Sequence, residues 1–428
     1  MWRRLRLGLL RDHDFRGLFA STTVSQFGQQ VTVLALPLVA VLALDVSEFQ
    51  VGLLFTFTTA AFLLVGLPAG AWVDRMRRRH VLIVCDLARA ALLVSIPVAW
   101  WADLLTLGQL YVVALVTGVF TVFFDVAYQS YLPHLVGREK LVEGNTKLEG
   151  VRAVSDVAGP GVAGQLIQAL TAPVALLVDA IAMALSATFV ARIRKREEKP
   201  ERKPDANLRR EIAEGLRFVL SHRLLRPIAI CTAAANFCLA AYAAMEIVFL
   251  ARVLGVSEGT IGLVFVFVGA GGVVGFLLVR RVVDWLGQGP TIWISVAVAM
   301  PFGLLLPMAQ PGPTLWLGAF GLLVVAAGTV IYNVIQVSFR QGLTPDHLLG
   351  RMNATMRFLV WGTMPLGGLA GGILGQLLGP RTALLVIAAA SMVTFLPVLL
   401  SPLRGMRELP QQPEGPDEPD AEQRLAQV

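Results

Sequence analysis

The chain has 428 residues, of which 56% are hydrophobic and only 15% are charged, and its formal net charge is +7. Soluble domains contain about 25% charged residues, and a chain this apolar cannot cover its surface with polar groups in water. The composition therefore excludes an ordinary cytosolic enzyme, a secreted disulfide scaffold and a disordered protein.

Twelve apolar runs are long enough to cross a bilayer as helices, which takes about 20 residues each. They are Leu18–Leu44, Phe49–Val73, His80–Trp101, Gln109–Tyr131, Val151–Leu170, Val174–Ala191, Pro227–Ala251, Thr260–Val279, Thr291–Met308, Leu315–Phe339, Phe358–Leu378 and Thr382–Leu400. The sequence thus predicts an all-α membrane protein with twelve transmembrane helices. Six spans fall in residues 18–191 and six in residues 227–400.

The basic residues are distributed asymmetrically between the predicted loops. The loops on one side of the membrane hold only Arg252 and Arg381, whereas nearly all other Lys and Arg residues lie on or near the opposite side. Cytoplasmic loops of membrane proteins carry the excess of basic residues, so we expect both termini to be cytoplasmic and the protein to lie in the cytoplasmic membrane. Residues 1–17 then form a cytoplasmic N-terminus.

Two further segments lie outside the predicted spans. The linker 192–226 carries 12 Lys and Arg residues, and apolar residues at helical spacing in 207–220 predict an amphipathic helix on the inner lipid surface. The tail 401–428 is acidic and rich in proline, which predicts a disordered cytoplasmic segment.

The two groups of six spans show traces of an internal repeat. Shifting the chain by 208 residues places Ser130 on Ser338, Asn145 on Asn353 and Asp125 on Asn333. Two pseudo-symmetric six-helix bundles are the plan of transporters in which the substrate site lies between the halves, near the membrane midplane. We therefore expect a cavity at this boundary.

A short motif follows the second span. It comprises Gly70, Asp74, Arg75, Arg78 and Arg79, with a shorter copy, Asp284 and Gly287, in the second half. The spacing resembles the signature loop of the major facilitator superfamily, with Arg77 in place of a glycine. The resemblance implies the major facilitator fold and a latch that holds the cytoplasmic side closed when the transporter faces out. A plain basic loop would explain the arginines, but not the aspartate in both halves.

Gly159, Pro160 and Gly164 in the fifth span resemble an exporter-associated motif of the same superfamily. Glycines let this helix pack closely against span eight, and proline bends it. Leu10–Arg16, Asp86–Arg89, Leu132–Val136 and Gly144-Asn145 are similar to one branch, which contains siderophore exporters and macrolide efflux pumps. This resemblance implies proton-driven export of amphipathic small molecules.

Several ionisable residues lie within the predicted spans, where each costs at least about 2.5 kcal/mol unless it is paired. We expect two groups to be mainly buried ion pairs or gate elements, namely Asp86 with Arg89, and Glu149 with Arg152 and Asp156. Asp125, Asp179 and Glu246 have no basic partner within a helical turn and are candidates for proton coupling. Polar contacts to neighbouring helices are the alternative. Span four lacks the arginine that many proton antiporters of the family carry, which leaves the coupling ion open.

Polar residues on three spans are candidates to line the substrate cavity. They are Gln26, Gln29, Gln30, Asn236, Tyr332, Asn333 and Gln336. The sequence has no phosphate-binding loop and no histidine pair with metal-ligand spacing, so we expect no enzyme activity, cofactor, metal or nucleic-acid partner. The predicted function is proton-linked efflux of a drug-like or siderophore-like molecule by a lipid-embedded monomer. The alternatives are uptake or flipping of a metabolite or lipid-like substrate, and a non-transporting interaction protein.

Overall fold

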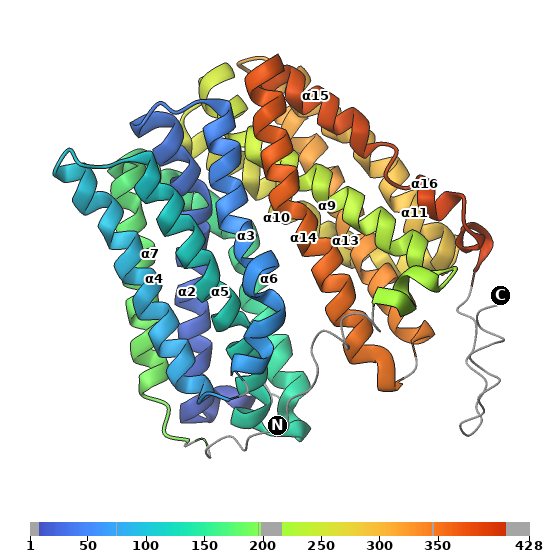
Figure 1. The fold of residues 1–428 in the computed structure, drawn as a ribbon, viewed down its shortest axis with the longest axis horizontal. Coiled ribbons are helices and arrows are strands. Elements are labelled where there is room, and N and C mark those ends of the chain that lie inside the picture. Colours follow the sequence, from blue (N-terminus) through green and yellow to red (C-terminus); the bar gives the residue numbers. More distant parts are fainter. Residues whose placement is uncertain (1–7, 74, 196, 198–215, 345, 408–428) are drawn as a thin grey trace.

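The computed structural model describes residues 8–73, 75–195, 197, 216–344 and 346–407, and this part of the chain contains helices and loops (Figure 1). The N-terminal half comprises η1 Gly8–Arg11, α2 His13–Leu38 continued by the π-helical turn η2 Val39–Ala43, α3 Glu48–Val73, α4 Arg78–Trp101, α5 Leu107–Val136, η3 Arg138–Lys140, α6 Leu141–Leu170 and α7 Ala172–Ala191.

The C-terminal half repeats this order. It comprises α9 Leu225–Val248 continued by the π-helical turn η4 Phe249–Val253, α10 Glu258–Leu286, α11 Gln288–Ala299, η5 Met300–Leu304, α12 Leu305–Met308, α13 Thr314–Leu343, α14 Asp346–Leu378, α15 Pro380–Ser391, α16 Leu396–Leu399 and η6 Pro402–Gly405. The predicted amphipathic helix at 207–220 and the acidic tail fall mostly outside the described residues.

Among the described residues, eleven helical segments are long and apolar enough to cross a membrane. The twelfth, α6, is 30 residues long but carries Glu149, Arg152 and Asp156 in its middle. The predicted twelve-helix architecture is confirmed.

Three helices differ in extent or continuity from the predicted spans. The helix α6 begins ten residues before the predicted Val151, and its polar first turns include an ion pair between Lys147 and Glu143 at 3.5 Å. α2 begins at His13, inside the predicted N-terminal segment, because the Asp12 carboxylate caps it by accepting from the backbone of Asp14 and Phe15. The predicted ninth span is broken into α11, η5 and α12, where proline and glycine interrupt the helix.

The halves form two helical bundles that lie close together at one end and diverge towards the other (Figure 1). Across the boundary, α3 packs against α14 and α6 packs against α10. The end that carries η1, the start of α4 and the start of α6 is here named the basic side. The opposite end, with the loops 44–47, 102–106, 254–257 and 309–313, is named the closed side.

Loops on the closed side confirm the internal repeat. Asp45, Asp103 and Thr171 have φ angles of 45°, 54° and 76°, and the residues about 208 to 210 positions later, Gly255, Gly312 and Gly379, also have positive φ. Residues with side chains adopt this backbone region rarely, so the three matching turns indicate one ancestral loop geometry used twice. The two π-helical turns also match, since η2 and η4 end the first helix of each half.

Candidate functional site

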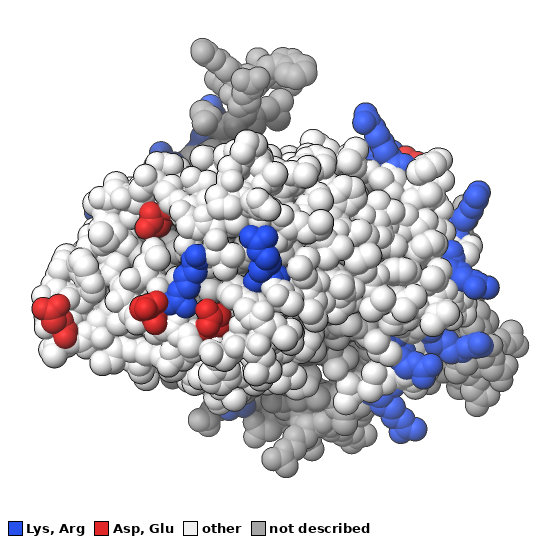
Figure 2. Space-filling view, turned by 90° about the horizontal axis from the view of Figure 1, so that it is seen from above, with Lys and Arg blue, Asp and Glu red and all other residues white. Residues whose placement is uncertain are grey.

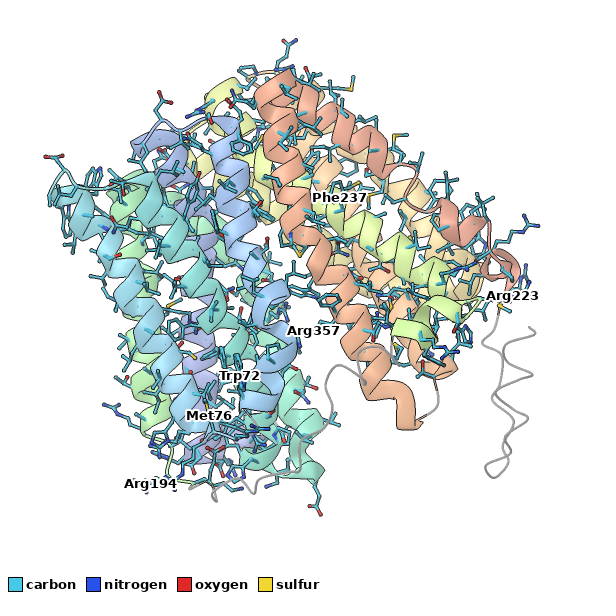
Figure 3. All side chains as sticks on the ribbon, in the orientation of Figure 1. Trp72, Met76, Arg194, Arg223, Phe237 and Arg357 are labelled. Atoms are coloured by element: carbon cyan, nitrogen blue, oxygen red, sulfur yellow. The ribbon has the colours of Figure 1, made fainter. Side chains whose placement is uncertain are left out.

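A cavity of about 1240 Å³ lies between the halves, in contact with α6 on one side and with α9, α10 and α13 on the other. It extends from Pro160, near the middle of α6, to Asn145, in the second turn of that helix on the basic side. Arg194 and Met76 mark the basic side in Figure 3. In the same view Arg357 on α14 lies between the two halves, nearer the middle of the molecule. The cavity therefore approaches the basic side.

The α6 wall of the cavity carries Glu149, Arg152 and Asp156. The Arg152 and Asp156 side chains are 62% and 50% exposed, and Arg152 Nε lies 4.0 Å from Asp156 Oδ2. Gln30 on α2 donates from Nε2 to Asp156 Oδ1 at 2.9 Å. The predicted pairing of Arg152 with Asp156 is present, but the predicted burial is wrong, because this face of α6 borders the cavity.

The opposite wall is mostly apolar and contains one isolated carboxyl group. Glu246 on α9 is 6% exposed, and its Oε1 has no hydrogen-bond partner among the described residues. Tyr242, one turn earlier, donates to the Gly303 carbonyl at 3.0 Å. The predicted residues Asn236, Tyr332 and Asn333 also line this wall. Glu246 is thus an unpaired acidic group beside a large apolar surface.

Three other predicted cavity residues do not line this cavity. Two of them are on α2, where Gln26 is half-buried and Gln29 is exposed. The neighbouring Gln30 does line the cavity. Gln336 is 3% exposed within the C-terminal bundle, where its Oε1 has no partner among the described residues. Asn145, Thr329 and Phe276 line the cavity but are absent from the sequence-based set. These residues lie on α6, α13 and α10, and the sequence does not show which face of each helix borders the cavity.

The predicted pair of Asp86 and Arg89 is formed inside the N-terminal bundle. Arg89 Nη2 lies 2.5 Å from Asp86 Oδ1, and the two side chains are 5% and 0% exposed. Ser186 on α7 donates to Asp86 Oδ2 at 2.6 Å, and the Arg89 guanidinium lies 4.5 Å from the Phe124 ring centroid. The pair joins α4, α5 and α7, so its immediate role is to hold this bundle together.

Asp125 and Asp179 lie outside the cavity lining. Asp125 on α5 is half-buried and interacts electrostatically with Arg89, Arg152 and Arg357, which come from other helices. Asp179 on α7 is fully buried, accepts a hydrogen bond from Thr32, and has an Oδ1 without a partner among the described residues. Of the three predicted proton-coupling residues, the structure places only Glu246 on the cavity wall.

The exporter-like motif lies where the halves meet. A Cβ added at Gly262 of α10 would come within 2.9 Å of Gly164 Cα and would also contact the Pro160 carbonyl. On the α3–α14 side, a Cβ at Gly372 would lie 2.9 Å from Gly52 Cα. The predicted close approach of span five to span eight is therefore present, and a second glycine contact matches it.

Replacing Gly262 by alanine is expected to destabilise the protein by about 1 to 3 kcal/mol, because the added methyl group collides with the α6 backbone. Gly66→Ala is the matched control, since a Cβ at that position of α3 meets nothing within 4 Å. Thermal unfolding of the two purified variants in detergent measures the difference. Equal unfolding temperatures would contradict the close packing of α6 and α10.

The signature motif lies at the junction of α3 and α4 on the basic side. A Cβ added at Gly70 meets nothing within 4 Å, so no helix packs closely against this glycine in this conformation. Arg79 donates to the backbone carbonyls of Val190 and Ala191, within its own half. Asp74 lies outside the described residues. In the second-half copy, Asp284 is exposed and Gly287 ends α10 with a φ of 84°.

The described residues contain no cluster of three histidine, cysteine, aspartate or glutamate side chains that could hold a metal ion. The three cysteines, Cys85, Cys231 and Cys238, are buried and free.

Comparisons with known proteins agree with this geometry. A family model described as Major Facilitator Superfamily matches residues 18–364. The chain is 29% identical over 388 residues to the multidrug efflux pump Tap of Mycolicibacterium fortuitum, which covers 87% of this chain and 91% of the relative. It is 26% identical over 437 residues to the enterobactin exporter EntS of Citrobacter koseri, with 96% and 98% covered.

Solved structures show the same fold. A bacterial homologue of the iron transporter ferroportin in an inward-facing state matches with a TM-score of 0.72 and 15% identity, covering 92% of this chain and 98% of that one. The nucleoside transporter NupG matches with a TM-score of 0.71 and 12% identity, covering 90% and 98%. A bacterial homologue of ferroportin in an outward-facing state matches with a TM-score of 0.58 and 16% identity, covering 90% of this chain and 98% of that one.

Proposed function

The chain belongs to the major facilitator superfamily, a family of membrane transporters, and from this starting point we propose that it exports drug-like or siderophore-like molecules in exchange for protons. The two halves would rock about their glycine contacts, so that the cavity opens to one side of the membrane at a time. The relatives named above are efflux and export proteins, which supports export over uptake.

The observation that carries the substrate class is the lining of the cavity. A volume of about 1240 Å³ exceeds the usual size of a pocket for a drug-sized ligand, and its walls combine an apolar surface with few polar groups. Such a surface gains binding energy from the apolar part of a ligand and orients the polar part through Asn236, Asn333 and the α6 charges. Amphipathic molecules fit this description better than sugars or inorganic ions.

Charge asymmetry supports the orientation. Arg16, Arg78, Arg79, Lys140 and Arg192 belong to the basic side, so we assign that side to the cytoplasm and the protein to the cytoplasmic membrane. The cavity would then receive its substrate from the cytoplasm or the inner leaflet in the conformation seen here.

The proposal is tested with purified protein in liposomes that contain a pH-sensitive dye. A proton gradient is imposed, and a panel of macrolides, cationic dyes and siderophores is added while the internal pH is recorded. We expect at least one compound to accelerate proton movement, and we expect protein-free liposomes to show no such effect. Uptake of a labelled compound without any proton movement would overturn proton coupling, and no transport of any compound would overturn the substrate class.

A further inference from the structure

The closed side contains an ion pair that joins the two halves. Arg252 lies in the π-helical turn η4 at the end of α9, in the C-terminal half. Asp45 follows the matching turn η2, and Glu48 begins α3, in the N-terminal half. Figure 2 shows this face from above, with acidic and basic residues lying near one another in the left half of the view.

The Arg252 guanidinium reaches three acceptors, all in the other half. Its Nη2 lies 2.8 Å from Asp45 Oδ1 and donates to the Val41 carbonyl at 3.2 Å. Its Nη1 lies 3.5 Å from Glu48 Oε1. Arginine suits this task because its planar group presents several donors in fixed directions and always stays charged.

The exposure of the side chains indicates which of the three contacts contributes most to the interaction. The side chains of Arg252 and Glu48 are 24% and 23% exposed, whereas Asp45 is 93% exposed. A carboxylate in full contact with water contributes little through an ion pair, because solvent screens the attraction. Glu48 is sheltered because α14 covers it, and a Cβ at Gly375 would lie 3.1 Å from Glu48 Cβ. Glu48 and the Val41 carbonyl therefore contribute most of the interaction.

Opening the closed side would move these groups apart. In the opened state water would hydrate Arg252 and Glu48 in place of their mutual contact. Contacts inside each half would stay unchanged. This distinguishes Arg252 from Arg381, the other basic residue of the closed-side loops, whose guanidinium lies 5.4 Å from the Phe249 ring centroid in the same half. Only the first of these two arginines bonds to the opposite half among the described contacts.

We propose that Arg252, with Glu48 and the Val41 carbonyl as its main acceptors, is the latch that holds the closed side shut and sets the balance between the two conformations. The proposal rests on the alternating-access function above. It goes beyond that function in assigning a latch on this side to one residue and two acceptors, beside the Gly259 amide, which donates to Gln168 across the halves at 3.1 Å.

The test measures the opening of the closed side directly. Spin labels are attached at Leu104→Cys and Gln310→Cys, two exposed positions in closed-side loops of opposite halves, in protein that lacks the three native cysteines. Pulsed electron spin resonance in lipid nanodiscs then gives the distribution of distances between the labels. No substrate or proton gradient is needed, so failure of the transport proposal and failure of the latch are distinguishable.

We expect Arg252→Gln to raise the fraction of the longer distance by about fivefold to tenfold, since a partly exposed ion pair and one charged hydrogen bond are lost. Arg252→Lys keeps the positive charge but has fewer hydrogen-bond donors, so it should give a smaller change. Glu48→Gln removes the sheltered carboxylate of the ion pair and should also raise this fraction. Arg381→Gln is the matched control and should leave it unchanged.

Three results would overturn the latch. The first is an unchanged distance distribution in Arg252→Gln. The second is an equal effect of Arg381→Gln, which would indicate a general loss of positive charge on this side. The third is an unchanged distance distribution in Glu48→Gln, because Glu48 supplies the sheltered carboxylate of the ion pair.

Discussion

Replacing Glu246 by glutamine is expected to reduce substrate-driven proton movement by about tenfold or more. Glutamine keeps the size and polarity of the side chain but cannot bind and release a proton. Glu246 lines the cavity, and its Oε1 has no hydrogen-bond partner among the described residues, so changes in water access during transport would act directly on its protonation. The liposome assay with the pH-sensitive dye measures the loss.

Binding of a neutral substrate should change little in Glu246→Gln, because the apolar wall around the residue stays intact. Asp103→Asn is the matched control, since Asp103 lies in an exposed loop between α4 and α5. Its positive φ of 54° is one that asparagine also tolerates. Full proton movement in Glu246→Gln would contradict the assignment and would direct attention to Asp125 and Asp179.

Replacing Arg89 by methionine is expected to destabilise the N-terminal bundle by about 3 to 5 kcal/mol. The change leaves the Asp86 carboxylate buried, with Ser186 as its remaining hydrogen-bond partner. Methionine retains much of the length and the apolar contacts of arginine, so the loss reports mainly the uncompensated charge. The expected fall in unfolding temperature is on the order of 10 °C.

Arg152→Met is the control for this prediction. Arg152 is 62% exposed, and its ion pair with Asp156 is long, so its loss should change stability by less than about 1 kcal/mol. A thiol-reactive dye measures both variants, because Cys85, Cys231 and Cys238 are buried and react on unfolding. Equal unfolding temperatures for the two variants would contradict the structural role of the Asp86–Arg89 pair.

Much of the fold was predictable because its signals are local. Each apolar run predicts one membrane span from its own length and hydropathy. The uneven distribution of lysine and arginine between the loops predicts which loops lie on the same side of the membrane. The family resemblance was likewise carried by short strings, and the family model confirms it. Asp86 and Arg89 were predictable partners because they lie three residues apart on one helix, where side chains meet regardless of tertiary packing.

The candidate site was only partly predictable. Glu149, Arg152 and Asp156 were expected to be buried, because a helix in lipid normally hides its charges, yet they border the cavity. Gln26, Gln29 and Gln30 share one helix, and the sequence does not show which of them faces the other half. Asp125 has no basic neighbour on its own helix but lies within electrostatic reach of arginines on α4, α6 and α14.

By itself the sequence determined the membrane class, the number of spans, the twofold repeat, the family and the short-range Asp86–Arg89 pair. The tertiary structure decided which residues face the cavity, that Glu246 remains unpaired there, and that Arg252 meets Glu48 from the opposite half. The physical reason is distance along the chain. Hydropathy and helical spacing act over a few residues, whereas the packing of one bundle against the other brings together groups that no local pattern connects.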